Sequence, residues 1–320
     1  MFNAITDVPG IRVGHYTDTN AATGCTVILC EEGAVAGVDV RGGAPGTRDT
    51  DLLNPVNVVE KIHAILLSGG SAFGLNAIGG VQRYLEEKGV GYEMAGVKIP
   101  IVPGAVVFDL DVGSARIRPG IPEGYQACQN AASGPVAEGC VGAGTGAMIG
   151  QLKGKRCAIK SGLGTASVKF YGDVIVAALF IVNALGDIID PATGQIIAGI
   201  RREDGKGFDN TIELMKQGYT YLAEPGHNTV VGAVVTNALL TKAQAAKVAQ
   251  MAHDGLARAI NPSHSMHDGD TIFALSLGGR ISDVTTVGSM AAEVTRLAII
   301  NAIKKATSLD GVPCFADLRH

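Results

Sequence analysis

The sequence predicts a single α/β domain in which sheets and helices form layers. Short apolar runs bounded by glycine recur along the chain, and their near-continuous apolarity indicates strands buried on both faces. Helical segments are interspersed with these runs, without the regular alternation of a doubly wound fold. No long polar linker divides the chain and no internal repeat is present. We therefore expect one layered domain over residues 1–320.

The bulk composition excludes several classes of function. The 320 residues are 47% hydrophobic, enough for a large core, and the formal net charge is -4. No cluster of Lys and Arg with interleaved aromatics indicates a nucleic-acid partner. No apolar run approaches the roughly 20 residues of a membrane helix, and the first residues lack the basic and apolar blocks of a signal peptide. We expect a cytoplasmic protein that binds neither nucleic acid nor membrane.

Seven apolar runs are expected to form buried strands. They cover residues 25–30, 34–40, 63–70, 97–103, 173–183, 229–237 and 271–279.

Three segments are expected to form helices. Residues 71–89 open on Ser71 as a candidate N-cap and end at Gly89. Thr241 can cap a helix over 242–260 whose apolar residues share one face. The segment 289–306 is apolar around more than half its circumference, so it should be mostly buried.

Familiar motifs are mostly incomplete. The six cysteines contain no CxxC pair, so they indicate neither a zinc site nor a redox motif and are expected to act as small hydrophobes. In "GGSAFG", Phe73 stands where a nucleophile elbow needs its second glycine. The glycine-rich run 142–155 lacks the G-K-[ST] ending of a P-loop. The stretch 40–51 could hold an anion with Arg41, Arg48 and backbone amides, or it could be a tight structural loop.

A threonine stands where a turn meets an apolar strand. In "PGHNTVVGAVVTNALL" (225–240), turn residues lead directly into a buried run that begins at Thr229. The preceding residues 204–228 are the most polar and irregular in the chain. Thr229 is either a β-branched residue that starts a strand well, or a nucleophile exposed at the junction.

A dense group of titratable residues precedes the last apolar run. His264, His267, Asp268 and Asp270 lie within seven residues. In an extended segment Asp268 and Asp270 project to the same side, which suits proton transfer or the binding of an ammonium group. With the two histidines they would also suit a metal ion, and a solvated turn is the third interpretation. Lys153 and Asn183 gain meaning only if the fold brings them next to Thr229.

The segments "HNTVVGAVVTNALLTKAQ" and "AINPSHSMHDGDTIFAL" resemble the self-processing N-terminal nucleophile hydrolases of the DmpA family. This family includes L-aminopeptidase/D-esterases, β-peptidyl aminopeptidases and endo-type 6-aminohexanoate-oligomer hydrolases. The resemblance extends in order over nearly the whole chain, through "ITDVPGIRVGHYTD", "ATGCTVIL", "VDVRGGAPGTRDTDLL", "LLSGGSAFGLNAIGGV", "GAGTGAM" and "VNALGDIID".

The resemblance implies a four-layer α-β-β-α sandwich of the DmpA/ornithine acetyltransferase type. It also implies self-cleavage between Asn228 and Thr229, which gives an α chain of residues 1–228 and a β chain of residues 229–320. Thr229 would be the nucleophile, with a small peptide or amide as substrate and with no cofactor or metal. Relatives are often homotetramers, so we expect a homo-oligomer.

Elementary chemistry supports that implied role. A free α-amine has a pKa of about 7.7–8.0, so an N-terminal threonine provides nucleophile and base in one residue. Before cleavage the same hydroxyl could attack the Asn228 carbonyl, and the turn at 224–228 is where we expect that bond to be strained or well oriented.

Other roles carry over by resemblance. Asp268 and Asp270 match an acidic pair that orients the new amine, and their D-G-D form is nearer the nylon-hydrolase type. Asn183 matches an asparagine that stabilises the oxyanion, and Lys153 matches a lysine near the nucleophile. Phe108 stands where several relatives carry an active-site tyrosine, so the substrate class transfers less well than the chemistry.

Three alternatives remain open at this stage. The acyl-enzyme could pass its acyl group to an amine, as in ornithine acetyltransferases. The residues His264, His267, Asp268 and Asp270 could form a metal-dependent site. The chain could also be an uncleaved paralogue with a binding or structural role.

Overall fold

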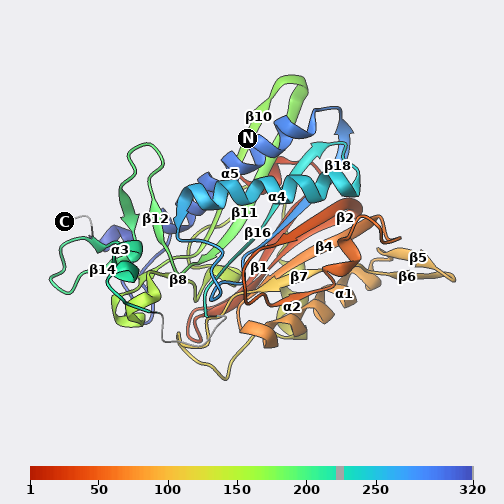
Figure 1. Cartoon of the computed structure of the whole chain (residues 1–320). Coiled ribbons are helices and arrows are strands. Elements are labelled where there is room, and N and C mark those ends of the chain that lie inside the picture. Colours follow the sequence, from red (N-terminus) through yellow and green to blue (C-terminus); the bar gives the residue numbers. More distant parts are fainter. Residues whose placement is uncertain (221–226, 319–320) are drawn as a thin grey trace.

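A nine-stranded sheet runs through the computed structural model of the chain, which describes residues 1–220 and 227–318 (Figure 1). Its strand order is β10-β11-β16-β18-β2-β4-β7-β3, and β1 pairs with β2 at the side. These strands are β1 Arg12–Asp18, β2 Thr23–Val40, β3 Thr47–Arg48, β4 Lys61–Ser68, β7 Gly104–Val106, β10 Leu163–Phe170, β11 Val174–Asn183, β16 Thr229–Ala238 and β18 Thr271–Arg280.

The long strand β2 joins the two halves of this sheet. It contains both predicted strands 25–30 and 34–40, with Gly33 between them at a φ of 85°. Before this glycine β2 pairs with β1 and β4, and after it β2 pairs mainly with β18, with a register shift against β4 between Leu29 and Ala34. A glycine and a register shift are the usual means of bending a strand. β2 therefore carries the chain from one half of the sheet to the other.

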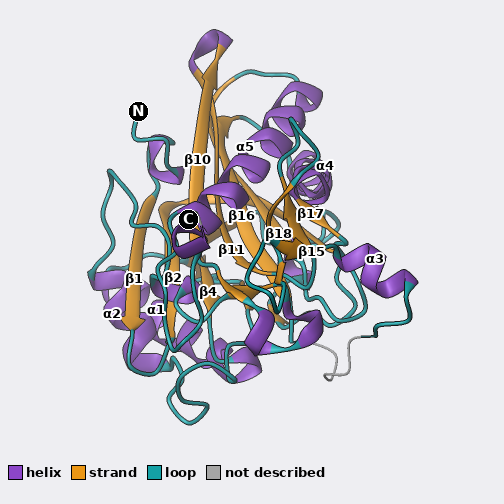
Figure 2. Cartoon of the chain, turned by 90° about the vertical axis from the view of Figure 1, so that its left-hand side faces the viewer, coloured by secondary structure: helices purple, strands orange, loops and turns teal. Residues whose placement is uncertain are grey.

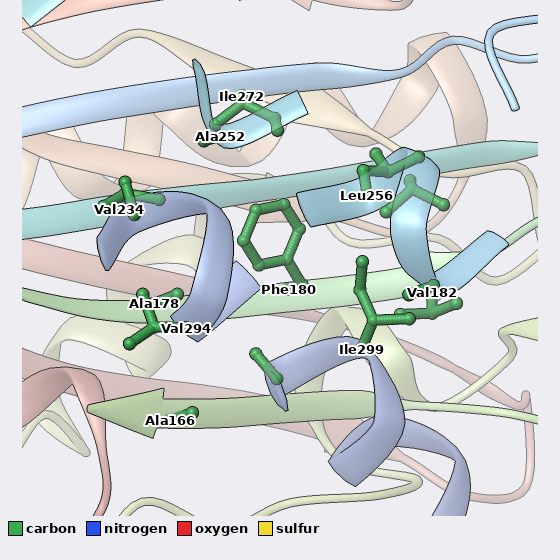
Figure 3. Close-up of a cluster of buried hydrophobic side chains, with 14 of the residues drawn as sticks. Ala166, Ala178, Phe180, Val182, Val234, Ala252, Leu256, Ile272, Val294 and Ile299 are labelled. Atoms are coloured by element: carbon green, nitrogen blue, oxygen red, sulfur yellow. The ribbon is translucent and has the colours of Figure 1, made fainter. Parts of the chain in front are cut away.

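Helices α4 (Lys242–Ala259) and α5 (Val284–Lys304) cover the half formed by β10, β11, β16 and β18. Side chains alternate along each strand, so one set faces these helices. Figure 3 shows Phe180 of β11 at the centre of that set, among Val234, Leu256 and Ile299. The helices α4 and α5 thus form one outer layer, packed on this half of the sheet.

The alternate side chains of the same strands point the other way. Leu179, Val231 and Phe273 share a second buried cluster with Ile65 and Leu67 of β4. The two halves of the sheet therefore pack face to face.

The far side of β2 and β4 is covered by α1 (Ile78–Glu87) and α2 (Ile121–Gln129). Val27 and Leu66 of the strands are buried with Val81 and Leu85 of α1 and Cys128 of α2. Figure 2 shows strands running between α1 and α2 on one side and α4 and α5 on the other. The predicted four-layer α-β-β-α sandwich is confirmed.

Of the three predicted helix starts, that of α4 is confirmed. Thr241 accepts a hydrogen bond from the Gln244 amide and donates its own amide to the Gln244 side chain, a capping box that starts α4 as predicted. Helix α5 begins at Val284, five residues before the predicted start, because Asp283 caps it. Residues 71–89 do not form one helix from Ser71, since a 3-10 helix over Ser71–Ala77 precedes α1.

The prediction of a buried strand over 97–103 is wrong. Strand β6 (Val97–Ile99) pairs with β5 (Tyr92–Met94) in a hairpin that extends from the body of the molecule (Figure 1), and its residues are exposed. An apolar run predicts a strand, but it does not show whether other elements pack on that strand and bury it.

Short elements complete the fold. They are β8 Met148–Ile149, β9 Ile159–Lys160, β12 Asp187–Ile189, β13 Ile196–Ala198, β14 Ile200–Arg201, β15 Phe208–Asp209, β17 Ile260–Asn261, α3 Thr211–Lys216 and the 3-10 helices Ile5–Asp7, Asp51–Leu53, Gly142–Gly144, Gln151–Lys153, Lys155–Cys157, Tyr171–Asp173 and Phe315–Leu318. In the described part of the chain, no helix is both long and apolar enough to cross a membrane. Residues 224–226 of the predicted turn lie outside the described residues.

Candidate active site

Three strand ends meet at one edge of the sheet. Thr229, the first residue of β16, is buried and lies opposite Asn183, the last residue of β11. Strand β18 runs parallel to β16, so the loop that precedes it lies beside the start of β16. There Asn228 and Asp268 form a β-bridge. The fold thus brings Thr229, Asn183 and the D-G-D loop together.

The Asn228–Thr229 peptide is held closely by this loop. The Thr229 hydroxyl lies against the carbonyl oxygen of Asn228 and donates a hydrogen bond to it. The Gly269 amide donates to the same oxygen at 3.0 Å, and the Asn228 amide donates to the His267 carbonyl at 3.3 Å. The Asn228 side chain is fully buried, and neither of its amide atoms has a hydrogen-bond partner among the described residues.

Gly269 must be a glycine in this arrangement. A Cβ at this position would lie 2.9 Å from the Thr229 Oγ1 and 2.8 Å from the Ala44 carbonyl oxygen. The absence of a side chain lets the backbone of the loop approach the threonine.

The two aspartates have different neighbours. Asp270 accepts the Val230 amide at 2.8 Å on one oxygen, and the other oxygen accepts the amide and the Nδ1–H of His264 at 3.0 and 2.7 Å. Asp268 accepts hydrogen bonds from the amide and the hydroxyl of Ser265. Burial, together with the nearby charge of Asp270, raises the pKa of Asp268 to about 6.

The side chains proposed as metal ligands are used in other contacts. The His264 ring binds Asp270, and Asp268 binds Ser265. Over residues 1–220 and 227–318, no group of three or more His, Cys, Asp or Glu side chains is arranged to hold a metal ion.

Asn183 has a fixed orientation. Its Oδ1 accepts the Met148 amide at 2.9 Å and the Gln151 Nε2 at 3.3 Å. Its Nδ2 donates to the carbonyls of Phe108 and His227 at 2.9 and 3.0 Å. The amide nitrogen therefore faces the segment that precedes Thr229, while the donor on the Asn228 carbonyl is the Gly269 amide.

Phe108 lies beside this segment. Its ring stacks on that of His227, with centroids 4.1 Å apart and an interplanar angle of 26°. The position that resembles a tyrosine site in relatives thus provides an apolar surface for the residue before the Asn228–Thr229 pair.

Lys153 lies to one side of these residues. It pairs with Asp209 at 2.8 Å and lies over the Tyr219 ring, on the wall of a cavity of about 690 Å³ that Gln151 and His227 also line. None of the contacts described for residues 1–220 and 227–318 joins it to Thr229.

A second lysine, Lys160, binds the backbone next to the residue that holds Asn183. Lys160 is fully buried, and its Nζ donates to the carbonyls of Thr145 and Ala147 at 2.8 and 2.6 Å. Burial lowers its pKa to about 8. Ala147 precedes Met148, whose amide holds Asn183. The sequence signal for this residue is a lysine inside the apolar run "CAIKSGLGT". Because lysine is rarely buried without partners, such a position indicates a lysine that binds specific groups in the core.

The loop over residues 41–44 is hydrogen-bonded to the backbone of Asp268 and Asp270. The amides of Arg41 and Gly42 donate to the Asp270 carbonyl, and that of Ala44 donates to the Asp268 carbonyl. Arg41 itself pairs with Asp39, while Arg48 pairs with Asp49. These amides are used internally, so the structure favours a structural loop over an anion site.

The fold matches that of a solved structure, an L-aminopeptidase D-Ala-esterase/amidase from Ochrobactrum anthropi. The TM-score is 0.75 over 98% of this chain and 88% of that chain, at 20% identity, and that protein is described as a variant of the Ntn hydrolase fold. The four layers therefore place this chain in the Ntn hydrolase fold class.

The family follows from the sequence matches. The model of Peptidase family S58 matches residues 3–314, and the chain belongs to this family. It is 42% identical to an uncharacterized aminopeptidase of Mycobacterium leprae, over 99% of this chain and 94% of that protein. It is 32% identical to a 6-aminohexanoate-oligomer endohydrolase of Kocuria sp., over 93% of this chain and 85% of that enzyme. Family membership makes the chain a hydrolase.

Proposed function

We propose that the chain cleaves its own Asn228–Thr229 bond and that the new N-terminal Thr229 then hydrolyses amide bonds through an acyl-enzyme. The observation that carries this proposal is the Thr229 hydroxyl beside the Asn228 carbonyl, with the Gly269 amide on the same carbonyl oxygen.

Self-cleavage starts with attack of the Thr229 Oγ1 on the Asn228 carbonyl carbon. The C–N bond breaks, the hydroxyl proton passes to the departing nitrogen, and an ester joins Asn228 to the Oγ1. Water then hydrolyses the ester, which gives the Asn228 carboxylate and leaves Thr229 as an N-terminal residue with a free amine and a free hydroxyl. The Gly269 amide is placed to stabilise the negative charge that develops on the carbonyl oxygen in the first step.

In turnover, the free amine of Thr229 accepts the proton of its own hydroxyl as this attacks the substrate carbonyl. The Thr229 ammonium passes this proton to the leaving amine, the C–N bond of the substrate breaks, and water hydrolyses the ester left on the Oγ1. Asp270 binds the Val230 amide, so its negative charge lies next to the N-terminal residue and favours the ammonium form. Asn183 donates to the oxyanion once the residues before Thr229 have moved away.

A small peptide or amide is the substrate class we propose. The cavity at Gln151, Lys153 and His227 is large enough for several residues of such a chain. Two relatives are named an aminopeptidase and a 6-aminohexanoate-oligomer endohydrolase, and both names describe the hydrolysis of amide bonds.

The test compares two variants of one residue. Thr229→Ala removes the hydroxyl, so we expect a single chain and a loss of peptidase and amidase activity of at least about a thousandfold. Thr229→Ser keeps hydroxyl and amine, so it should be cut and remain active. Thr236→Ala, in the same strand, serves as the control for strand integrity. An active Thr229→Ala variant would refute the proposal.

A further inference from the structure

His264 presents two donors to one carboxylate oxygen of Asp270. Its backbone amide and its ring Nδ1 both lie within hydrogen-bond distance of the Oδ2, at 3.0 and 2.7 Å. The residue has a φ of 57°, in the left-handed region that residues other than glycine adopt uncommonly. The chain accepts this backbone conformation at the point where both donors reach the carboxylate.

The carboxylate that His264 binds is also the one that binds the residue after Thr229. Asp270 is almost fully buried, and its other oxygen accepts the amide of Val230, the residue after Thr229. A buried carboxylate stays ionised only when donors compensate for lost water. With three donors, two of them from His264, Asp270 has that compensation.

We propose that His264 is a positioning residue that fixes the Asp270 carboxylate in its ionised form beside the amine of Thr229. The inference rests on the proposed function, since it concerns the same amine.

The His264 ring also packs against a second histidine. The His264 ring meets the buried His253 edge-on, with centroids 4.7 Å apart. His253 in turn lies 3.1 Å from the Asp39 carbonyl oxygen, and the Asp39 carboxylate pairs with Arg41. The His264 side chain is only 21% exposed. Packing therefore fixes the ring so that its Nδ1 faces Asp270.

The charged groups around His264 set the expected pH behaviour. Asp270 contacts the His264 ring from the same loop and His253 contacts it from α4, while Asp39, which pairs with Arg41, contacts His253. Without the ring donor, the ionised form of Asp270 loses a charge-assisted hydrogen bond. We expect the acid side of the rate–pH curve to move to higher pH.

The decisive experiment separates the donor from the loop conformation. His264→Asn keeps a donor near the Nδ1 position and tolerates a positive φ, whereas His264→Gly tolerates the same φ without any donor side chain. His264→Gln places its amide nearer the Nε2 position. We expect self-cleavage to slow about tenfold in the Gly and Gln variants and to stay within about twofold of wild type in the Asn variant.

The readouts are the rate of fragment appearance by intact mass, the rate–pH profile of the cleaved protein, and the Tm of each variant. Met266→Ala, an exposed position in the same loop, is the control. Equal rates and equal pH profiles in the Asn, Gly and Gln variants would overturn the inference, as would equal slowing in all three. A wild-type chain that is neither cleaved nor active would instead overturn the proposed function.

Discussion

Asp268 and Asp270 are separated by one glycine, yet their neighbours give them different properties. Asp270 accepts three hydrogen bonds and is directed to the residue after Thr229. Asp268 is bound by Ser265, and its pKa is raised to about 6 because it is buried next to Asp270. Of the two carboxyl groups, Asp268 is therefore the one whose pKa burial and its neighbour raise to about 6.

This difference predicts how stability depends on pH. The folded-state pKa of Asp268 lies above the ordinary value of 3.8, so its contribution to stability is present below about pH 4 and is lost as pH rises through about 6. In the uncleaved Thr229→Ala background, Asp268→Asn removes this dependence. The Tm of the parent should fall relative to that of the variant between pH 4 and pH 7. Parallel Tm curves over that range would contradict the assignment.

The sequence was informative for residues at strand ends. Thr229, Asn183, Asp268 and Asp270 lie together because adjacent strands end at one edge of the sheet. The Gly269 amide could not be predicted, since a backbone donor has no residue type of its own. The role of Lys160 depends on the carbonyls of Thr145 and Ala147, and that of His264 on a backbone φ of 57°. Neither feature leaves a periodic pattern in the sequence.

At the scale of elements, the loop over residues 41–44 determines the position of the aspartates. Its amides bind the carbonyls of Asp268 and Asp270, and Gly42 lies directly against the backbone between them. A Cβ on Gly42 would lie 2.3 Å from the Asp268 oxygen and from the Asp270 nitrogen. Both contacts are with backbone, which cannot move as a flexible side chain does.

Gly42→Ala should therefore displace the D-G-D loop. We expect self-cleavage to slow by at least about tenfold, because a small displacement of reacting groups is costly in rate. Gly79→Ala is the matched control, since its added Cβ meets only the Ile121 side chain, at 3.2 Å. Rates of fragment formation by intact mass check both variants, and an unaffected Gly42→Ala variant would contradict the role of the loop.

Element prediction succeeded where the local signal was complete. The Thr241 N-cap and the apolar runs of β11, β16 and β18 were identified from the sequence. The buried strand predicted over 97–103 was wrong, because β6 lies in a hairpin whose residues are exposed. Strand β10 and helix α2 were not predicted.

At the scale of the whole molecule, the proposed cut passes through the centre of the fold. Strands β16 and β18 belong to residues 229–320 but lie between β11 and β2 of the preceding part. Helices α4 and α5 of the same part cover β10 and β11, with Phe180 packed against Leu256 and Ile299 (Figure 3). Hydrogen bonds and core contacts therefore join the two parts on both sides.

The fragments should stay together after cleavage. We expect residues 1–228 and 229–320 to co-elute in native size-exclusion chromatography, to separate in denaturant, and to melt in a single transition. Fragments that separate on simple dilution would contradict this expectation.

The layered architecture was predicted on two different grounds. Apolar runs predicted sheets and helices in one domain, whereas the four-layer arrangement was implied by family resemblance alone. An apolar run predicts a buried strand, but it does not show whether a helix or another sheet packs against that strand. In this fold the two halves of the sheet face each other because β2 changes its partners at Gly33.

The most direct test of the central claim is the intact mass of the purified chain under denaturing conditions, after incubation at neutral pH. We predict two fragments whose masses sum to that of the precursor plus one water, with the smaller fragment beginning at Thr229. A single full-length mass in an active enzyme would contradict the claim, because Thr229 would then be a buried strand residue without a free amine.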